Sequence, residues 1–275
     1  MSSSSAYAIG IISLGCAKNL VDSEYICSRL RAEGYRFTDE IASADILLVN
    51  TCAFIDDARR ESIDAILEAA SNKKTGACRF LVVAGCLSQR YAGDLPEALP
   101  EVDAFLGLDQ SDDIVRVLNA WREGRREAGV PPIPAAQPKR LFEPPPGRQT
   151  LTGGPHAYVK ISEGCNHRCA FCAIPAIRGR ARSRAPADIR AETEALLSNA
   201  SREICLVAQD TSAYGRDRGD GANLAGLLRE LGRIGGDFWI RMLYGFPSLI
   251  SDDLLQAMSE TGQVCHYLDE VRERR

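Results

Sequence analysis

The chain has 275 residues, enough for about two domains, with 45% hydrophobic and 25% charged residues, as in an ordinary globular protein. Its formal net charge of −4 excludes a general attraction to nucleic acid or anionic lipid. The polar start lacks the features of a secretory signal, and no stretch reaches the roughly 20 apolar residues of a membrane span. We therefore expect a cytoplasmic protein with no membrane contact, whose ten cysteines serve metal or redox chemistry rather than disulfides.

The first 123 residues alternate apolar strands with amphipathic helices. Strands are predicted at 8–13, 45–50, 79–84 and 104–106, and helices at 20–33, 56–74 and 112–123. In the second helix, Ile63, Ile66 and Leu67 are expected to be apolar contacts. This alternation predicts an N-terminal domain, residues 1–123, with an open parallel α/β sheet covered on both faces.

Cysteines directly follow three of these strands, at Cys16, Cys52 and Cys86. Because the C-terminal ends of parallel strands share one edge, where such folds bind ligands, we expect the three thiols to converge. Gly15 and Gly85 would let the backbone turn sharply beside them. We interpret this set as an iron–sulfur site. Two alternatives stay open: small buried residues that happen to end strands, and a zinc site, which three cysteines without a nearby histidine fit less well.

Residues 124–154 differ in composition from the flanking chain. They have few large apolar residues and contain seven prolines: Pro131, Pro132, Pro134, Pro138, Pro144, Pro145 and Pro146. Such a stretch is typical of a semi-rigid linker. The alternative is that part of it packs as hairpins on the second domain.

Residues 155–275 repeat the strand–helix pattern. Strands are predicted at 157–162, 203–208 and 238–243, helices at 186–199, 223–233 and 252–260, and a fourth strand could begin at 266–269. The pattern is that of a (β/α) barrel, whose catalytic residues lie at the C-terminal ends of its strands. With only about three repeats, an incomplete barrel is expected.

The most informative motif follows the first strand of this domain, where Cys165, Cys169 and Cys172 form a C-x3-C-x2-C run. Three thiols cannot all pair as disulfides, because one is always left over, whereas thiolates are the usual ligands of iron–sulfur clusters. A four-iron cubane held by three cysteines keeps one iron open, and an open metal position is where a small molecule can react. We predict a catalytic cluster here.

Polar residues elsewhere in this domain are candidates for the same site. Gln209 and Asp210 follow the second strand and are expected to face the cluster cavity and hold a cofactor, although an ordinary turn is the alternative. Four arginines follow the cysteine loop, at positions 178, 180, 182 and 184. They suit either a clamp for a carboxylate or polyanion, or a solvated basic loop.

The other cysteines and the histidines have simpler interpretations. Cys27, Cys78, Cys205 and Cys265 have no partner at ligand spacing and are expected to be packing residues. His167 lies inside the cysteine loop but is not expected to be a ligand, because the three cysteines already define the site.

Several stretches together resemble a known family. The run Cys165-x3-Cys169-x2-Cys172, with Phe171 before its last cysteine, resembles the radical S-adenosylmethionine (SAM) signature. The stretch from Ser13 to Glu24 resembles the opening of the methylthiotransferases. The runs 162–169, 174–179 and 209–215 are similar to the RimO branch, which modifies an aspartate of small-subunit ribosomal protein S-twelve.

This resemblance implies a function and two cofactor sites. Cys165, Cys169 and Cys172 would hold a [4Fe-4S] cluster that binds SAM through its open iron and cleaves it reductively, and the resulting deoxyadenosyl radical would abstract a hydrogen atom from the β-carbon of the aspartate. Phe171, Arg178, Gln209 and Asp210 would belong to the cofactor site. Cys16, Cys52 and Cys86 would hold an auxiliary [4Fe-4S] cluster that carries the sulfur group. No acid–base pair is then needed, because the cofactors supply the chemistry.

The resemblance also implies partners and a difference in length. We expect ribosomal protein S-twelve or the small ribosomal subunit as substrate, a flavodoxin- or ferredoxin-like reductant, and a monomer. Members of the family continue beyond the position of Asp269, complete the barrel and add a C-terminal TRAM domain, so we expect this chain to be truncated. Two alternatives are a MiaB-like tRNA adenosine methylthiotransferase and an inactive iron–sulfur-binding fragment.

Overall fold

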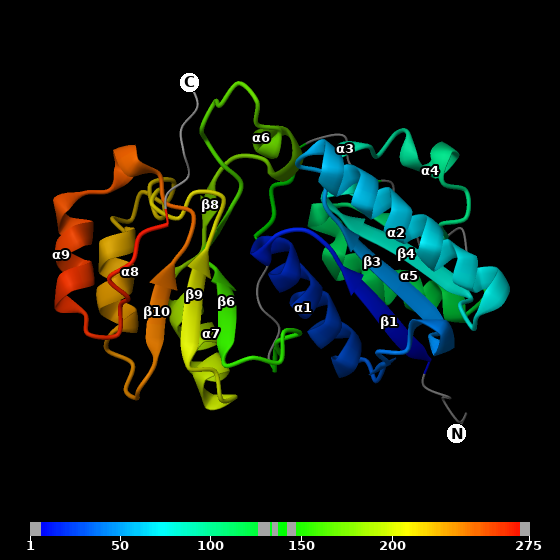
Figure 1. Cartoon of the computed structure of the whole chain (residues 1–275), viewed down its shortest axis with the longest axis horizontal. Coiled ribbons are helices and arrows are strands. Elements are labelled where there is room, and N and C mark those ends of the chain that lie inside the picture. Colours follow the sequence, from blue (N-terminus) through cyan, green and yellow to red (C-terminus); the bar gives the residue numbers. More distant parts are fainter. Residues whose placement is uncertain (1–6, 126–132, 134–136, 142–146, 270–275) are drawn as a thin grey trace. The chain divides into compact units, whose positions relative to one another are not determined.

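The computed structural model describes residues 7–125, 133, 137–141 and 147–269. The chain divides into two compact units, unit 1 (Met1–Pro138) and unit 2 (Lys139–Arg275) (Figure 1). Of the seven linker prolines only Pro138 lies within the described residues, and residues 270–275 lie outside them as well. The domain limits 1–123 and 155–275, with a linker between them, stay a proposal.

Unit 1 is built on a five-stranded sheet with the strand order β2-β1-β3-β4-β5, in which every pair is parallel. The strands are β1 (Ala8–Ser13), β2 (Arg36–Phe37), β3 (Ile46–Thr51), β4 (Phe80–Gly85) and β5 (Ala104–Leu106). β3 and β4 are buried along their whole length, as strands covered on both faces must be. The predicted parallel α/β sheet is confirmed. The two-residue edge strand β2 is not predicted from sequence.

Helices α1 (Ala17–Ala32) and α5 (Ile114–Arg122) cover one face of this sheet. Ile26 and Leu30 of α1 and Val117 of α5 share a buried apolar cluster with alternate residues of the central strands. Two shorter helices, α3 (Cys86–Arg90) and α4 (Leu95–Ala98), connect β4 to β5. The 3-10 turns Ile41–Ser43 and Leu108–Asp113 complete the unit.

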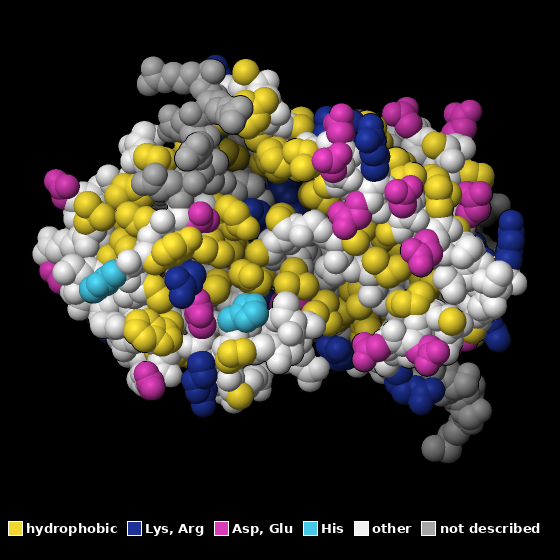
Figure 2. Space-filling model, in the orientation of Figure 1, with side chains coloured by type: hydrophobic (Ala, Val, Ile, Leu, Met, Phe, Trp, Pro, Cys, Tyr) yellow, Lys and Arg dark blue, Asp and Glu magenta, His cyan; other side chains and the backbone are white. Residues whose placement is uncertain are grey.

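Helix α2 (Asp56–Thr75) packs on β3 and β4 outside that cluster and so covers the other face (Figure 1). Its contact surface corrects the sequence prediction. Ile66 is buried, but Ile63 and Leu67 are 37% and 46% exposed. The remaining buried residues of α2 are the small side chains Ser62, Ala69 and Ala70, which let the helix lie close to the sheet. On the face shown in Figure 2, acidic side chains are scattered over the surface around α2.

Unit 2 contains a three-stranded parallel sheet with the strand order β10-β9-β6. The strands are β6 (His156–Lys160), β9 (Glu203–Val207) and β10 (Trp239–Met242). A short antiparallel pair, β7 (Ser162–Glu163) and β8 (Arg182–Ser183), flanks the cysteine loop. Residues 266–269 form no strand; instead, Val264 makes an isolated parallel bridge to Ile240 of β10.

Helices α7 (Pro186–Ser198), α8 (Leu224–Leu231) and α9 (Asp252–Glu260) pack on this sheet through Ile189, Leu228 and Met258, among others. α6 (Ile174–Arg178) follows the cysteine loop, and a 3-10 turn spans Pro247–Leu249. The βα repeats expected of a radical SAM domain are confirmed. None of the helices in the described part of the chain is long and apolar enough to cross a membrane.

Candidate functional site

The cysteine loop of unit 2 lies between β7 and α6, at the carboxyl edge of the sheet. The Cys165 backbone N–H donates to the Gly179 carbonyl (3.1 Å) and the Cys172 N–H donates to the Cys169 carbonyl (3.1 Å), so both ends of the loop are fixed. Cys165 is buried, whereas Cys169 and Cys172 are partly exposed. Burial raises the pKa of the Cys165 and Cys172 thiols.

Gly164 makes this loop possible. Its φ is +77°, and a Cβ at this position would lie 2.2 Å from the Arg180 carbonyl oxygen. Only glycine therefore allows the backbone entering the cysteine loop to press against the segment that leaves it. Gly164 therefore helps to set the path of the backbone into the cysteine loop.

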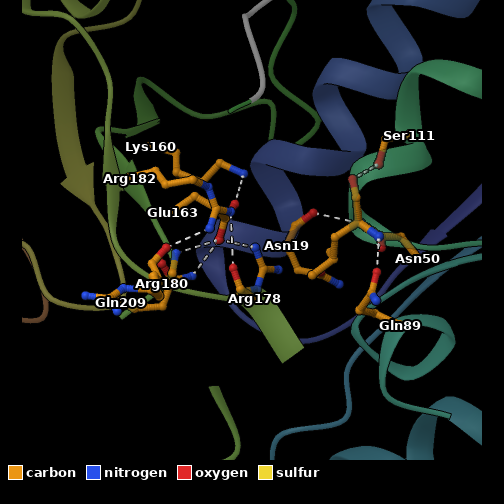
Figure 3. Close-up of polar contacts among 12 residues, drawn as sticks. Asn19, Asn50, Gln89, Ser111, Lys160, Glu163, Arg178, Arg180, Arg182 and Gln209 are labelled. Carbon is orange, nitrogen blue, oxygen red and sulfur yellow. Dashed lines mark hydrogen bonds and ion pairs between the residues drawn. The ribbon is translucent and has the colours of Figure 1, made fainter. Parts of the chain in front are cut away.

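A buried carboxylate, Glu163, lies directly before the loop and contacts three other side chains. It pairs with Lys160 (2.7 Å) and Arg178 (2.8 Å) and accepts a hydrogen bond from the Gln209 amide nitrogen (3.0 Å) (Figure 3). Burial alone would raise the pKa of Glu163, but the Arg178 and Lys160 cations outweigh it and hold the pKa below its ordinary value. Glu163 thus ties β6, the loop, α6 and the end of β9 together.

A second buried carboxylate, Glu192 of α7, supports the same edge. It pairs with Arg148 and, at 2.6 Å, with Arg184, whose guanidinium also donates to the Lys160 carbonyl (2.8 Å). Burial acts to raise the Glu192 pKa, yet Arg184 and Arg148 lower it overall. Arg148, only 5% exposed, belongs to the interior of unit 2 although it falls within the predicted linker.

These ion pairs show what two of the four arginines after the cysteine loop contact. Arg178 and Arg184 are buried and committed to the carboxylates Glu163 and Glu192, which is neither of the two interpretations weighed from the sequence. Arg180 is exposed, and Arg182 donates to the Arg180 carbonyl (2.6 Å). Phe171, also a candidate for cofactor binding, is 62% exposed beside Cys172.

Gln209 and Asp210 lie just past the end of β9, where Gln209 contacts Glu163 and Asp210 contacts the cysteine loop; their role in holding a cofactor stays a prediction. The amide oxygen of Gln209 is buried and has no hydrogen-bond partner within the described residues. Asp210, 4% exposed, contacts His167 of the cysteine loop with 2.6 Å between Oδ2 and Nε2. A buried acceptor without a hydrogen-bond partner, here beside the cysteine loop, is suited to accept a hydrogen bond from a bound molecule.

His167 is a site residue that the sequence interpretation set aside. Its ring stacks on Phe246, with centroids 4.1 Å apart and an angle of 12° between the planes. Asp210 follows β9 and Phe246 follows β10, so His167 joins the cysteine loop to both neighbouring strand ends. A cavity of about 280 Å³ adjoins it, with Cys165, His167 and Asp210 in its wall. The available signal was that Asp210 and Phe246 come shortly after the parallel strands β9 and β10.

The N-terminal cysteines also lie at one sheet edge. Cys16 precedes α1, Cys52 follows β3, and Cys86 opens α3 directly after β4. A Cβ on Gly15 (φ +90°) would lie 2.8 Å from the Cys52 Cβ, and one on Gly85 (φ +96°) would lie 2.7 Å from the Thr51 carbonyl oxygen. The backbone segments that carry the three thiols are therefore in contact, and two glycines permit it.

The donor chemistry of both sets fits iron–sulfur clusters, since each offers three thiols and no competing carboxylate within the set. Within the described residues, no three His, Cys, Asp or Glu side chains are gathered closely enough to hold a metal ion as they stand. Cys27, Cys78, Cys205 and Cys265 are buried, which confirms their packing role.

Comparisons with known proteins match this architecture. Residues 8–107 match the uncharacterized protein family UPF0004, and residues 159–273 match the radical SAM superfamily. Among solved structures, the chain is similar to the radical SAM methyltransferase TsrM of Kitasatospora setae, with a TM-score of 0.66 and 16% identity, covering 96% of this chain and 59% of TsrM. The radical SAM enzyme OxsB gives a TM-score of 0.57 at 12% identity, covering 93% of this chain and 42% of OxsB. At these low identities, the similarities to solved structures show a shared fold alone.

Curated relatives are much more similar to this chain in sequence than the solved structures are. The chain is 46% identical over 261 residues to the ribosomal protein uS12 methylthiotransferase RimO of Natranaerobius thermophilus, and 44% identical over 264 residues to RimO of Syntrophotalea carbinolica. Each match covers 95% of this chain, which spans 58% and 56% of the respective relative's length. Over nearly its whole length the chain is therefore similar to the RimO methylthiotransferases, and residues 159–273 match the radical SAM superfamily.

Proposed function

We propose that this chain acts as a radical SAM methylthiotransferase on an aspartate of ribosomal protein uS12. The observation that carries the proposal is the pair of three-cysteine sets, each at the carboxyl edge of its own parallel sheet. The relatives named for this activity support the choice of substrate. Because the chain spans 58% of the Natranaerobius thermophilus relative, the activity is proposed for this chain rather than transferred to it.

In this proposal, each of the two cysteine sets holds one iron–sulfur cluster. Cys165, Cys169 and Cys172 would hold the [4Fe-4S] cluster that meets SAM, and Cys16, Cys52 and Cys86 would hold an auxiliary [4Fe-4S] cluster. When bound and reduced, the first cluster supplies the electron for SAM cleavage. The protein's task is then to bind, to orient and to exclude water.

Residues around the first set have distinct roles in this proposal. The free amide oxygen of Gln209 is an acceptor for the ammonium group of SAM. Asp210 orients His167 on the loop, and Arg178 acts through Glu163 rather than on the cofactor. Phe171 covers the loop from outside, next to Cys172.

The remaining parts of the proposal concern the surroundings of the enzyme. We place it in the cytoplasm as a monomer, with uS12 or the small ribosomal subunit as partner and a flavodoxin- or ferredoxin-like protein as reductant. The absence of a membrane-spanning helix from the described residues is compatible with that location.

The direct test is a reaction of the reconstituted full chain with uS12, SAM, sulfide and dithionite under argon, read by mass spectrometry of the uS12 peptides. We expect an aspartate-containing peptide to gain one methylthio group in place of hydrogen, and deoxyadenosine to form. The Cys165→Ala variant should yield neither product. If a longer RimO modifies uS12 in the same assay and this chain makes no deoxyadenosine, the proposed activity is wrong for this chain.

A further inference from the structure

Three backbone segments in unit 1 carry the N-terminal cysteines, and two buried side chains link these segments. Asn19 of α1 is 1% exposed, and its amide nitrogen donates to two carbonyls at once, those of Leu14 (2.7 Å) and Thr51 (3.1 Å). Leu14 lies two residues before Cys16, and Thr51 lies immediately before Cys52. One side-chain amide thus joins the first cysteine segment to the second.

Thr51 continues the chain of contacts to the third segment. Its side chain is fully buried, and its hydroxyl donates to the Ala84 carbonyl at 2.6 Å. Ala84 lies two residues before Cys86. Each link joins neighbouring strand ends at the edge where the three thiols lie, so the spacing of Cys16, Cys52 and Cys86 depends on both.

Two further contacts hold these links in place. Asn50 donates from its amide nitrogen to the Asn19 carbonyl (2.9 Å), as Figure 3 shows, and to the Ser23 hydroxyl (2.8 Å). The Ser62 hydroxyl of α2 accepts from the Cys52 N–H (3.0 Å) and donates to the Cys52 carbonyl (2.8 Å). The Cys52 backbone is therefore fixed from both sides of the sheet.

We propose that Asn19 and Thr51 are positioning residues of the N-terminal thiol set: they fix the separation of its three cysteine segments and so determine how tightly the set holds a cluster. This inference rests on the proposed function, which assigns a cluster to Cys16, Cys52 and Cys86. The physical reason is that groups behind the ligands orient them, and losing such a contact costs about 10- to 100-fold in metal affinity. Asn19 and Thr51 touch neither SAM nor substrate in this role.

The experiment uses the full chain with Cys165, Cys169 and Cys172 replaced by alanine, so that all bound iron reports on the N-terminal set. In this parent, Thr51→Val keeps the shape of the side chain and removes the hydroxyl that donates to the Ala84 carbonyl. Asn19→Asp keeps the size of the side chain but replaces the amide nitrogen with an oxygen, which cannot donate to the Leu14 and Thr51 carbonyls. Thr51→Ser, which keeps the hydroxyl, is the rescue variant. Asn72→Ala is the control, because Asn72 donates to the Glu68 carbonyl (3.2 Å) on the exposed side of α2.

Two readouts are taken on folded protein isolated by gel filtration: the rate of iron loss to a chelator and the electron paramagnetic resonance spectrum of the reduced cluster. We expect iron loss about tenfold faster, with an altered spectrum, for Thr51→Val and for Asn19→Asp. Thr51→Ser and Asn72→Ala should match the parent. A purely structural role would lower the unfolding midpoint without changing either readout, so the spectrum separates the two roles.

The outcomes are distinguishable. If the parent holds iron and Thr51→Val loses it at the parent's rate with the parent's spectrum, the positioning role is refuted while the proposed cluster stands. If the parent itself holds no iron after reconstitution, the proposed cluster site fails and this inference fails with it. Should Thr51→Val not fold, Asn19→Asp decides by the same two readouts.

Discussion

Glu163 links several of the segments that surround the cysteine loop of unit 2. Its carboxylate is buried between Lys160 and Arg178 and also binds Gln209. Replacing it with glutamine would leave two buried cations without their counter-charge. Removing one partner of a buried ion pair typically costs about 3–5 kcal/mol, because the remaining charge is not solvated. We expect Glu163→Gln to reduce the free energy of unfolding of unit 2 by that amount.

The measurement is urea unfolding followed by fluorescence in a Trp121→Phe background, where Trp239 of unit 2 is the remaining tryptophan of the two in the chain. The matched control is Glu194→Gln, because Glu194 makes a solvent-exposed pair with Arg190 (2.9 Å), and such pairs contribute under about 1 kcal/mol. A loss below about 1 kcal/mol for Glu163→Gln would show that the network does not stabilise the unit.

Residue-scale features were the hardest to derive from sequence. The cysteines were found because their spacing and their position after strands carry a chemical meaning. Glu163, Glu192 and Arg148 were not, because a buried ion pair leaves no periodic pattern: each charge looks like an ordinary surface residue until its partner is placed beside it. His167 was not expected to be a ligand because three cysteines already define the site, and its contact with Asp210, 43 positions away in the chain, leaves no local pattern.

At the scale of elements, the cysteine loop depends on the backbone conformation of Gly164. Alanine there would have to adopt a left-handed conformation, which costs roughly 1–2 kcal/mol, and its Cβ would also clash with the Arg180 carbonyl. We expect Gly164→Ala to release the loop and to lower the iron bound by Cys165, Cys169 and Cys172. The assay is iron content in a background where Cys16, Cys52 and Cys86 are alanine.

Gly235→Ala is the control for that experiment, since a Cβ at Gly235 meets no atom within 4 Å and its φ is not in the left-handed region. It should bind as much iron as the parent. Equal iron content in Gly164→Ala and Gly235→Ala would contradict the role given to this glycine.

The elements themselves were largely predictable. Strands β1 and β5 and helix α9 fall where the apolar pattern put them, because each is bounded by clear polar or turn residues. Helix α1 begins at Ala17 rather than at residue 20, because Cys16 acts as its N-cap and the first turn contains polar residues. In α2, small buried residues replaced the large apolar ones on which the pattern depends. The two-residue strand β2 is too short to show alternation.

At the scale of the whole molecule, acid should destabilise unit 2 through its buried carboxylates. The pKa values of Glu163 and Glu192 are lowered in the folded state, whereas an unfolded glutamate titrates near about 4.3. Their contribution to stability is therefore complete above about pH 5 and is lost as the pH falls through the unfolded value toward the folded pKa. We expect the free energy of unfolding of unit 2 to fall measurably between about pH 5 and about pH 3.

This dependence can be followed by urea unfolding in the Trp121→Phe background between neutral and acid pH. Glu163→Gln should flatten the acid limb, because one of the two responsible groups is gone, and Glu194→Gln should not. An acid limb that is identical in Glu163→Gln and the parent would assign the pH dependence to other groups.

The central claim is that one chain carries two separate three-cysteine cluster sites, one in each unit. It is tested most directly by counting iron and sulfide in the full chain after anaerobic reconstitution. We predict about eight irons per chain, about four after Cys16, Cys52 and Cys86 are replaced by alanine, and about four after Cys165, Cys169 and Cys172 are replaced. A content near four in the unaltered chain that stays unchanged when the three N-terminal cysteines are removed would contradict the two-cluster account.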